Sequence, residues 1–223
     1  MSEAQGAGMS AVPLFPLPNI VLFPRAILPM HIFEERYKAM TADVLASDRT
    51  IAMALLKPGW EKDYHHRPAI EPVVCLGEIL TWEKLSDGKY NFLLQGRRRA
   101  RVVREVSGMP YRAADLAVFE EEMALEIDLE RERGQMRHLF SKGMLAALPA
   151  GGQFRKLLDS PLPTVAIADL LAFALLEDVQ VKQGLLGEAN VRRRVAQVVE
   201  ALGTYSSHFN PGLRGFPTSP EMN

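Results

Sequence analysis

The first half of the chain shows the short, closely spaced apolar runs that are typical of strands. Extended segments or strands are predicted at residues 12–23, 26–32, 50–56, 73–84, 90–95, 99–106 and 111–119. Ser86-Asp87-Gly88-Lys89 separates two of them, and its Asp-Gly pair accepts the positive dihedral angles of a tight hairpin turn. Gly96 is expected to break the strand pattern a second time. Many short strands in succession favour a small, closed or nearly closed β-barrel.

One helix interrupts this strand pattern early in the chain. Between residues 34 and 47, apolar side chains such as Tyr37, Met40 and Val44 recur at helical spacing. The acidic residues at the start of this segment are favoured there, because a helix dipole stabilises carboxylates in the first turn. We therefore expect a single helix within the barrel-forming part.

After residue 120 the apolar spacing becomes that of helices. Helices are predicted over residues 123–147, from Pro163 onwards, over 179–186 and over 191–202. The last of them carries the clearest signals, because Asn190 can cap its start and Gly203 is expected to end it.

The predicted fold class is therefore α+β, with the strands first and the helices second. The expected order is a disordered tail at 1–11, a β-barrel at 12–120, a helical bundle at 121–205 and an irregular tail at 206–223. No internal repeat is visible. The two units follow one another along the chain.

Composition and charge narrow the class of function. Of the 223 residues, 48% are hydrophobic and 24% charged, which is typical of a globular protein. The formal net charge of -1 gives no general attraction to nucleic acid or to anionic membranes. The one cysteine, Cys75, cannot form a disulfide within the chain, which fits a cytoplasmic location.

Residues 11–33 are apolar enough to suggest a signal or membrane segment. Prolines punctuate this stretch, Arg25 lies within it, and the only charged residue before it is Glu3. A membrane helix tolerates such interruptions badly, and a signal peptide needs basic residues at its start. We expect a soluble protein that does not enter the membrane.

The proline- and aromatic-rich opening is the most specific motif of the chain. It reads Leu-Phe-Pro-Leu at 14–17, Leu-Phe-Pro at 22–24, Leu-Pro-Met-His-Ile-Phe-Glu at 28–34 and Arg36-Tyr37. Further blocks follow at 77–79, 87–90, 96–102, 167–171, 182–186 and 191–195. Together these blocks, over residues 12–203, resemble the N-terminal substrate-binding domain of Lon proteases.

The resemblance implies a PUA-like β-barrel followed by a helical bundle, and the capture of unfolded or damaged polypeptides. In full-length Lon this region precedes an ATPase ring and a serine-lysine protease. Here no Gly-x-x-x-x-Gly-Lys-Ser/Thr occurs, so we expect a stand-alone member without either domain, without enzymatic activity and without a cofactor. It would act as an adaptor or holdase, with a separate protease as one candidate partner, and a weak homo-oligomer is left open.

Aromatic and charged side chains provide the candidate binding residues. Trp60 and Tyr64 lie in the loop at 57–72, where they would either bind a polypeptide or fold back as a lid on the barrel core. Four further residues belong to the family motif, namely Phe33, Glu34, Arg36 and Tyr37. They would either shape a peptide groove or hold the early helix on the barrel through a Glu-Arg pair.

Two alternative functions depend on other residues. On a strand, Arg97, Arg99 and Arg101 would share one face and could meet phosphates, so a nucleic-acid-binding PUA-like protein is the main alternative. Pairing of these arginines with acids such as Glu83 and Glu105 is the simpler explanation, which makes nucleic acid an unexpected partner.

An uncharacterised hydrolase is the second alternative, and no residues support it. Cys75 lies in an apolar run and no Gly-x-Ser-x-Gly occurs, so no catalytic residue is assigned. His65-His66 has no second group of ligands with it, and no metal site is predicted.

Overall fold

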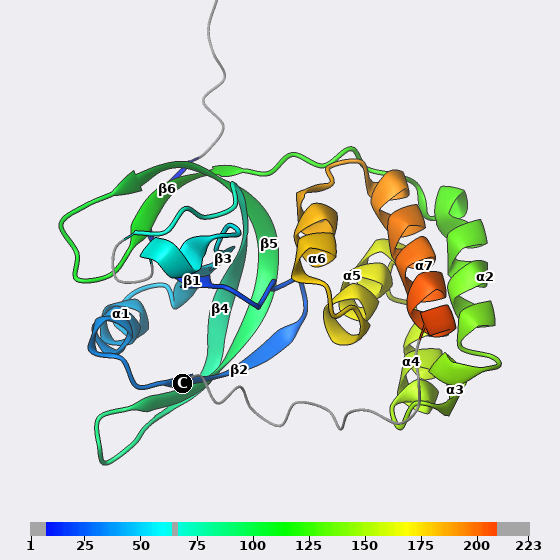
Figure 1. Ribbon diagram of the computed structural model, residues 1–223, viewed down its shortest axis with the longest axis horizontal. Helices are drawn as coiled ribbons and strands as arrows, with labels where there is room; N and C mark the ends of the chain where they lie inside the picture. Colours follow the sequence, from blue (N-terminus) through cyan, green and yellow to red (C-terminus); the bar gives the residue numbers. More distant parts are fainter. Residues whose placement is uncertain (1–7, 64–66, 209–223) are drawn as a thin grey trace, which may run out of the picture.

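The structure is a computed structural model that describes residues 8–63 and 67–208, with strands first and helices second (Figure 1). The strands are β1 (Met9–Leu17), β2 (Ile27–Ile32), β3 (Thr50–Leu55), β4 (Val73–Lys84), β5 (Tyr90–Val106) and β6 (Ala113–Val118). The α-helices are α1 (Glu35–Leu45), α2 (Glu130–Leu139), α3 (Met144–Ala147), α4 (Gly151–Leu158), α5 (Thr164–Leu175), α6 (Val179–Gly187) and α7 (Val191–His208). Two short 3-10 helices are η1 (Trp60–Asp63) and η2 (Glu126–Leu129). The α+β class is confirmed.

The six strands form one curved sheet in the order β2-β5-β4-β3-β1-β6. Strand β5 also pairs with β6, so five of the strands close a ring. Strand β2 lies outside that ring and pairs with residues 90–95, the first part of β5. The barrel is therefore closed along one part and open beside β2.

Strand β5 is continuous, and the predicted break at Gly96 is wrong. The Gly96 N–H donates to the Ala26 carbonyl at 2.8 Å, and the Arg25 N–H donates to the Gly96 carbonyl at 2.7 Å. A Cβ at this position would lie 2.0 Å from the Phe23 carbonyl oxygen. The residue is glycine because a loop backbone crosses the strand there, and the strand itself runs on.

Helix α1 packs against β1 with the face that the sequence predicts. The side chains of Tyr37, Met40 and Val44 are buried, and the ring of Tyr37 stacks on Phe15 at a centroid distance of 4.1 Å. This contact anchors the family motif in the core of the barrel.

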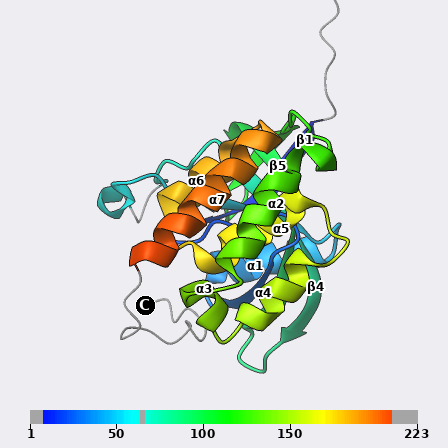
Figure 2. The same cartoon turned by 90° about the vertical axis from the view of Figure 1, so that its right-hand side faces the viewer.

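The helical half differs from the prediction at its start. The single helix expected at 123–147 is wrong, because residues 123–125 are not helical and the rest is divided among η2, α2 and α3. Just before this range, Glu122 forms an isolated β-bridge with Asn190. There the Glu122 N–H donates to the Ala189 carbonyl at 2.9 Å. The helices begin only later, and α4 was not predicted. Helices α2 and α7 run alongside each other (Figure 2), and α5 packs on α7.

Both predicted tails are too long. Strand β1 already begins at Met9, which pairs with Leu116 of β6 inside the expected tail of residues 1–11. At the other end, α7 passes through Gly203 to His208, since one glycine costs a helix only about 1 kcal/mol. The cap of α7 is confirmed, because the Arg193 N–H donates to Asn190 Oδ1 at 2.9 Å.

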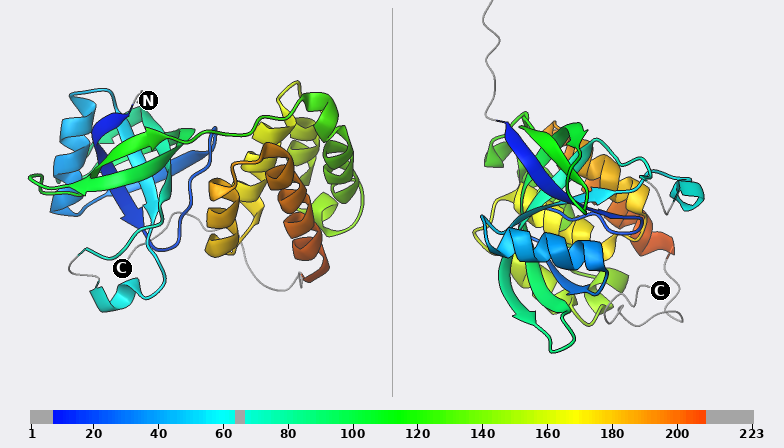
Figure 3. Two further views of the ribbon diagram at one scale, coloured as in Figure 1. Left: turned by 90° about the horizontal axis from the view of Figure 1, so that it is seen from above. Right: turned by 90° about the vertical axis from the view of Figure 1, so that its left-hand side faces the viewer.

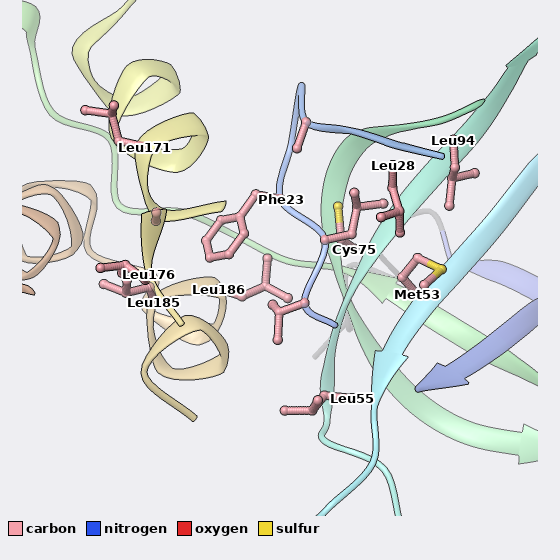
Figure 4. Packing of buried hydrophobic residues seen from close by; sticks show 14 of the residues in the cluster. Phe23, Leu28, Met53, Leu55, Cys75, Leu94, Leu171, Leu176, Leu185 and Leu186 are labelled. Carbon is pink, nitrogen blue, oxygen red and sulfur yellow. The ribbon is translucent and has the colours of Figure 1, made fainter. Parts of the chain in front are cut away.

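The barrel and the helices share one apolar core. Figure 3 shows the two halves side by side, with α6 next to the barrel. In Figure 4, Phe23 and Leu186 of α6 lie close together in the space between the barrel strands and the helices. Both side chains belong to the same buried cluster, and the Gln183 side chain donates to the Val73 carbonyl at 2.9 Å. The helices therefore hold the barrel in a defined orientation.

Charged side chains at this junction are buried as well. Arg99 of β5 binds Asp169 of α5 through both oxygens, at 3.0 and 2.8 Å. Arg194 of α7 lies 2.6 Å from Glu121, which follows the barrel. We call these four residues the junction cluster. It joins strand β5 to helices α5 and α7.

Cys75 lies in the barrel wall and is expected to be unreactive in the folded protein. Burial raises the pKa of its thiol from the ordinary 9.0 to about 12, an effect that nearby Arg99 only partly offsets. A raised pKa keeps the thiol neutral, so the reactive thiolate should be roughly a thousandfold rarer at mildly alkaline pH than in the unfolded chain. Reaction with a chromogenic disulfide reagent, with and without urea, measures this difference. Rapid labelling of the native protein would contradict the burial.

Candidate functional site

Strand β2 presents a free backbone edge. Pro29 pairs with Leu93 of β5. Because proline has no N–H to donate, this is a pair without mutual hydrogen bonds, and the carbonyl group of Pro29 points away from β5. By alternation, the N–H and carbonyl groups of Ile27 and His31 point the same way. Among the residues that the structure describes, no strand pairs with this edge. Another extended chain could add to it.

An apolar groove accompanies this edge, with a volume of about 480 Å³. We call it the β2 groove; it is lined by Leu17, Ile20, Pro29, Met30, His31, Thr81, Trp82, Glu83, Asn91, Phe92 and Leu93. Trp82 is 47% exposed and Leu93 is 37% exposed. His31 Nδ1 and Asn91 Oδ1 are joined across the two strands by a hydrogen bond of 2.7 Å. Most of the lining is apolar, with one carboxylate at Glu83.

The residues of the family motif lie in different environments. Phe33 is exposed next to the groove, and its ring lies 6.2 Å from that of His31. Tyr37 is buried in the barrel core. Glu34 and Arg36 do pair, at 2.9 Å, but they join the start of α1 to its own first turn. The expectation that this pair holds the helix on the barrel is therefore corrected.

The structure describes only part of the loop at 57–72, which carries Trp60 and Tyr64. Trp60 begins η1, is half-buried, and does not line the β2 groove. Tyr64 and His65-His66 lie outside the described residues. The role of Trp60 and Tyr64 in binding stays a prediction.

The face of three arginines does not form. Leu76 pairs with Arg98 but Gly77 pairs with Gly96, so β5 carries an extra residue and its alternation shifts. Arg97 is exposed and lies 2.9 Å from Glu78, while Arg99 is buried against Asp169. Arg97 and Arg99 are thus paired with acids other than the ones named, whereas Arg101 lies over the ring of Phe119 at 5.4 Å. The predicted face shared by Arg97, Arg99 and Arg101 is therefore wrong.

Sequence reasoning missed Ile27, Trp82 and Leu93 as exposed apolar residues. One signal was available, because three consecutive apolar residues at 92–94 must place at least one side chain outside an alternating strand. A second missed feature lies at 123–127, where the segment before η2 and the first turn of η2 expose Met123, Leu125 and Ile127 to 76%, 71% and 71%. Because a helix was predicted over this segment, the exposure of these side chains was not anticipated.

The described residues hold no cluster of three His, Cys, Asp or Glu side chains that could bind a metal ion. Within the same part of the chain, each helix is too short or too polar to cross a lipid bilayer.

Comparison with known proteins agrees with the fold and the motif. Residues 11–204 match the family model described as ATP-dependent protease La (LON) substrate-binding domain. The chain is 25% identical over 194 residues to a Lon protease of Desulfosudis oleivorans, covering 86% of this chain and 23% of that protein. A Lon protease 2 of Myxococcus xanthus is 25% identical over 197 residues, with coverage of 86% and 23%. The chain spans about a quarter of the length of these relatives.

Two solved structures share the fold. The N-terminal domain of the Mycobacterium avium complex Lon protease superposes with a TM-score of 0.68 at 18% identity. The Lon N-terminal domain protein from Xanthomonas campestris gives 0.62 at 22% identity. Each comparison covers 86% of this chain and 98% of the other. The whole arrangement of barrel and helices is therefore common to all three.

Proposed function

Because this chain belongs to the family of Lon protease substrate-binding domains, we propose that it recognises unfolded segments of other polypeptides without chemistry of its own. The observation that carries the proposal is the free edge of β2 beside the β2 groove. An adaptor or holdase for unfolded or damaged proteins needs such a surface.

The edge and the groove supply two kinds of contact. An added strand forms hydrogen bonds through its backbone, and these do not depend on the sequence of the bound chain. Pro29 removes one donor from the edge but leaves the groups of Ile27 and His31. Trp82 and Leu93 offer apolar area at low ordering cost, which suits clients that expose their cores.

The double variant Trp82→Ala/Leu93→Ser tests this proposal. Both residues are partly exposed, so the fold should tolerate the change. We expect binding of reduced, carboxymethylated α-lactalbumin to weaken about tenfold, which corresponds to ~1.4 kcal/mol of lost contact. Isothermal titration calorimetry measures the affinity, and circular dichroism checks that the barrel is intact.

Trp60→Ala serves as the matched control. It removes an aromatic side chain of the same type at a half-buried position outside the β2 groove. If Trp60→Ala weakens binding while the double variant does not, the binding surface is the loop and our assignment is wrong. Failure of the wild-type protein to bind any unfolded chain would overturn the proposed function itself.

A further inference from the structure

A second groove lies in the helical half, between α6 and the last turns of α7, with a volume of about 600 Å³. We call it the α6–α7 groove; it is lined by Leu176, Glu177, Asp178, Val181, Gly184, Leu185, Glu188, Gln197, Glu200, Ala201, Thr204 and Tyr205. It shares no lining residue with the β2 groove. The two surfaces can therefore be tested separately.

The floor of the α6–α7 groove is apolar. Leu176 and Leu185 form its base with exposures of 7% and 3%, and Val181 is 42% exposed at its side. Because Val181 lies beside these buried leucines, it adds to the apolar area that a bound segment could cover. The groove therefore has an apolar contact to offer.

The rim of the same groove is acidic. Four of its lining residues are carboxylates and none is Lys, Arg or His, although the whole chain has almost equal numbers of basic and acidic residues, 26 and 27. Glu188 pairs with Arg193 at 3.4 Å, and Asp178 caps α6 by accepting from the Gln180 N–H at 2.8 Å. Within the described residues, neither Glu177 nor Glu200 is within ion-pairing distance of a basic side chain. Both carboxylates are therefore available to pair with a basic group of a bound segment.

The basic side chains nearby are engaged elsewhere. Lys182 of α6 donates to the Phe173 carbonyl at 2.8 Å. Burial lowers the pKa of its ammonium group, and the charge of Glu177 offsets part of this effect without forming an ion pair. On α7, Arg192 binds Asp128 at 2.7 Å and Arg194 binds Glu121 at 2.6 Å. Burial and then the charge of Glu177 raise the pKa of the Tyr205 phenol, as expected beside a negative rim. Among the described residues, none of these cations lines the groove itself.

We propose that the α6–α7 groove binds an amphipathic segment of another polypeptide, with apolar side chains on the floor and Lys or Arg against Glu177 and Glu200. Charge complementarity selects this occupant, since an acidic or neutral apolar segment would leave both carboxylates unpaired at the contact. The site goes beyond the proposed function, because it prefers basic segments where the β2 groove is nearly indifferent to sequence.

The test uses the full chain and a short fluorescein-labelled peptide of leucine and lysine in amphipathic helical order. Fluorescence anisotropy of the label measures how tightly the peptide binds. We expect Glu177→Gln/Glu200→Gln to weaken binding about tenfold at low salt, with a smaller difference at high salt because salt screens exposed charges. Val181→Ser should weaken binding at both salt concentrations. The same peptide with glutamate in place of lysine should not bind.

Matched controls lie outside the groove. Glu120→Gln/Glu130→Gln removes the same charge from two other exposed glutamates, and Val103→Ser changes a valine that is 63% exposed on β5. Both controls should bind the peptide like the wild type. If the control pair weakens binding as much as Glu177→Gln/Glu200→Gln, the effect is general charge and the groove is not the site.

Three further outcomes would overturn the proposal. Loss of binding in Trp82→Ala/Leu93→Ser alone would place the peptide in the β2 groove. Peptide binding by Phe209→Ser/Phe216→Ser but not by the wild type would show that residues 209–223 occupy the groove instead. A dimer in sedimentation that Val181→Ser dissociates would show that a second copy covers it. In each case binding of carboxymethylated α-lactalbumin still decides the proposed function independently.

Discussion

Replacing Arg99 by methionine is expected to lower the free energy of unfolding by about 3 kcal/mol. Arg99 and Asp169 are 4% and 3% exposed, and the guanidinium group binds both carboxylate oxygens. Removing one member of a buried pair costs ~3–5 kcal/mol, because the remaining charge is left without a partner. We expect the lower end of this range, since Arg194 remains 3.6 Å from Asp169. Urea denaturation measures the loss.

Two companion variants give this experiment its controls. Arg97→Met changes an arginine two residues earlier, whose ion pair with Glu78 is 46% and 43% exposed, so the loss should stay under about 1 kcal/mol. The double variant Arg99→Met/Asp169→Leu should lower the free energy of unfolding by less than the sum of its two single variants. In the double variant, no buried charge is left without a partner at either position. Equal losses for Arg97→Met and Arg99→Met would contradict a stabilising role of the junction cluster.

Gly96→Ala is expected to destabilise the protein by ~3 kcal/mol or somewhat more. The new Cβ would lie 2.0 Å from the Phe23 carbonyl oxygen and 2.8 Å from its carbonyl carbon. Overpacking in a core costs ~1–3 kcal/mol, and here backbone rather than a flexible side chain has to move. The loop that precedes β2 would be displaced, so binding at the β2 groove should weaken together with stability.

Gly134→Ala is the matched control for this variant. Gly134 lies within α2, and nothing is within 4 Å of the position that its Cβ would take. The substitution should stabilise the protein by about 0.5–1 kcal/mol, because alanine has the higher helix propensity. Thermal denaturation of both variants separates the two effects. Similar melting temperatures for Gly96→Ala and the wild type would mean that the loop does not cross β5 as described.

Local features of the chain were predictable from the sequence. The limits of β4, the buried face of α1 and the cap of α7 at Asn190 were all predicted correctly. Each depends on residues within a few positions of one another, so spacing and capping chemistry are sufficient. The family motif was recognisable for the same reason, because its prolines and aromatics follow one another in order.

The candidate surface could be predicted only in part. Phe33 was identified and lies exposed beside the β2 groove, whereas Tyr37 of the same motif is buried. Trp82 and Leu93 were missed, because their exposure depends on where the barrel is left open. No rule of strand alternation states which edge of a sheet remains unpaired.

By itself the sequence determined the fold class, the family and most helices and strands, since these follow from periodicity and short motifs. Tertiary structure alone decided that Gly96 continues a strand, that Arg99 is buried at the junction and that Glu122 pairs with Asn190 instead of leading directly into a helix. All three depend on partners far along the chain, such as Phe23, Asp169 and Asn190. A residue's neighbours in sequence do not reveal which distant backbone or charge will be packed against it.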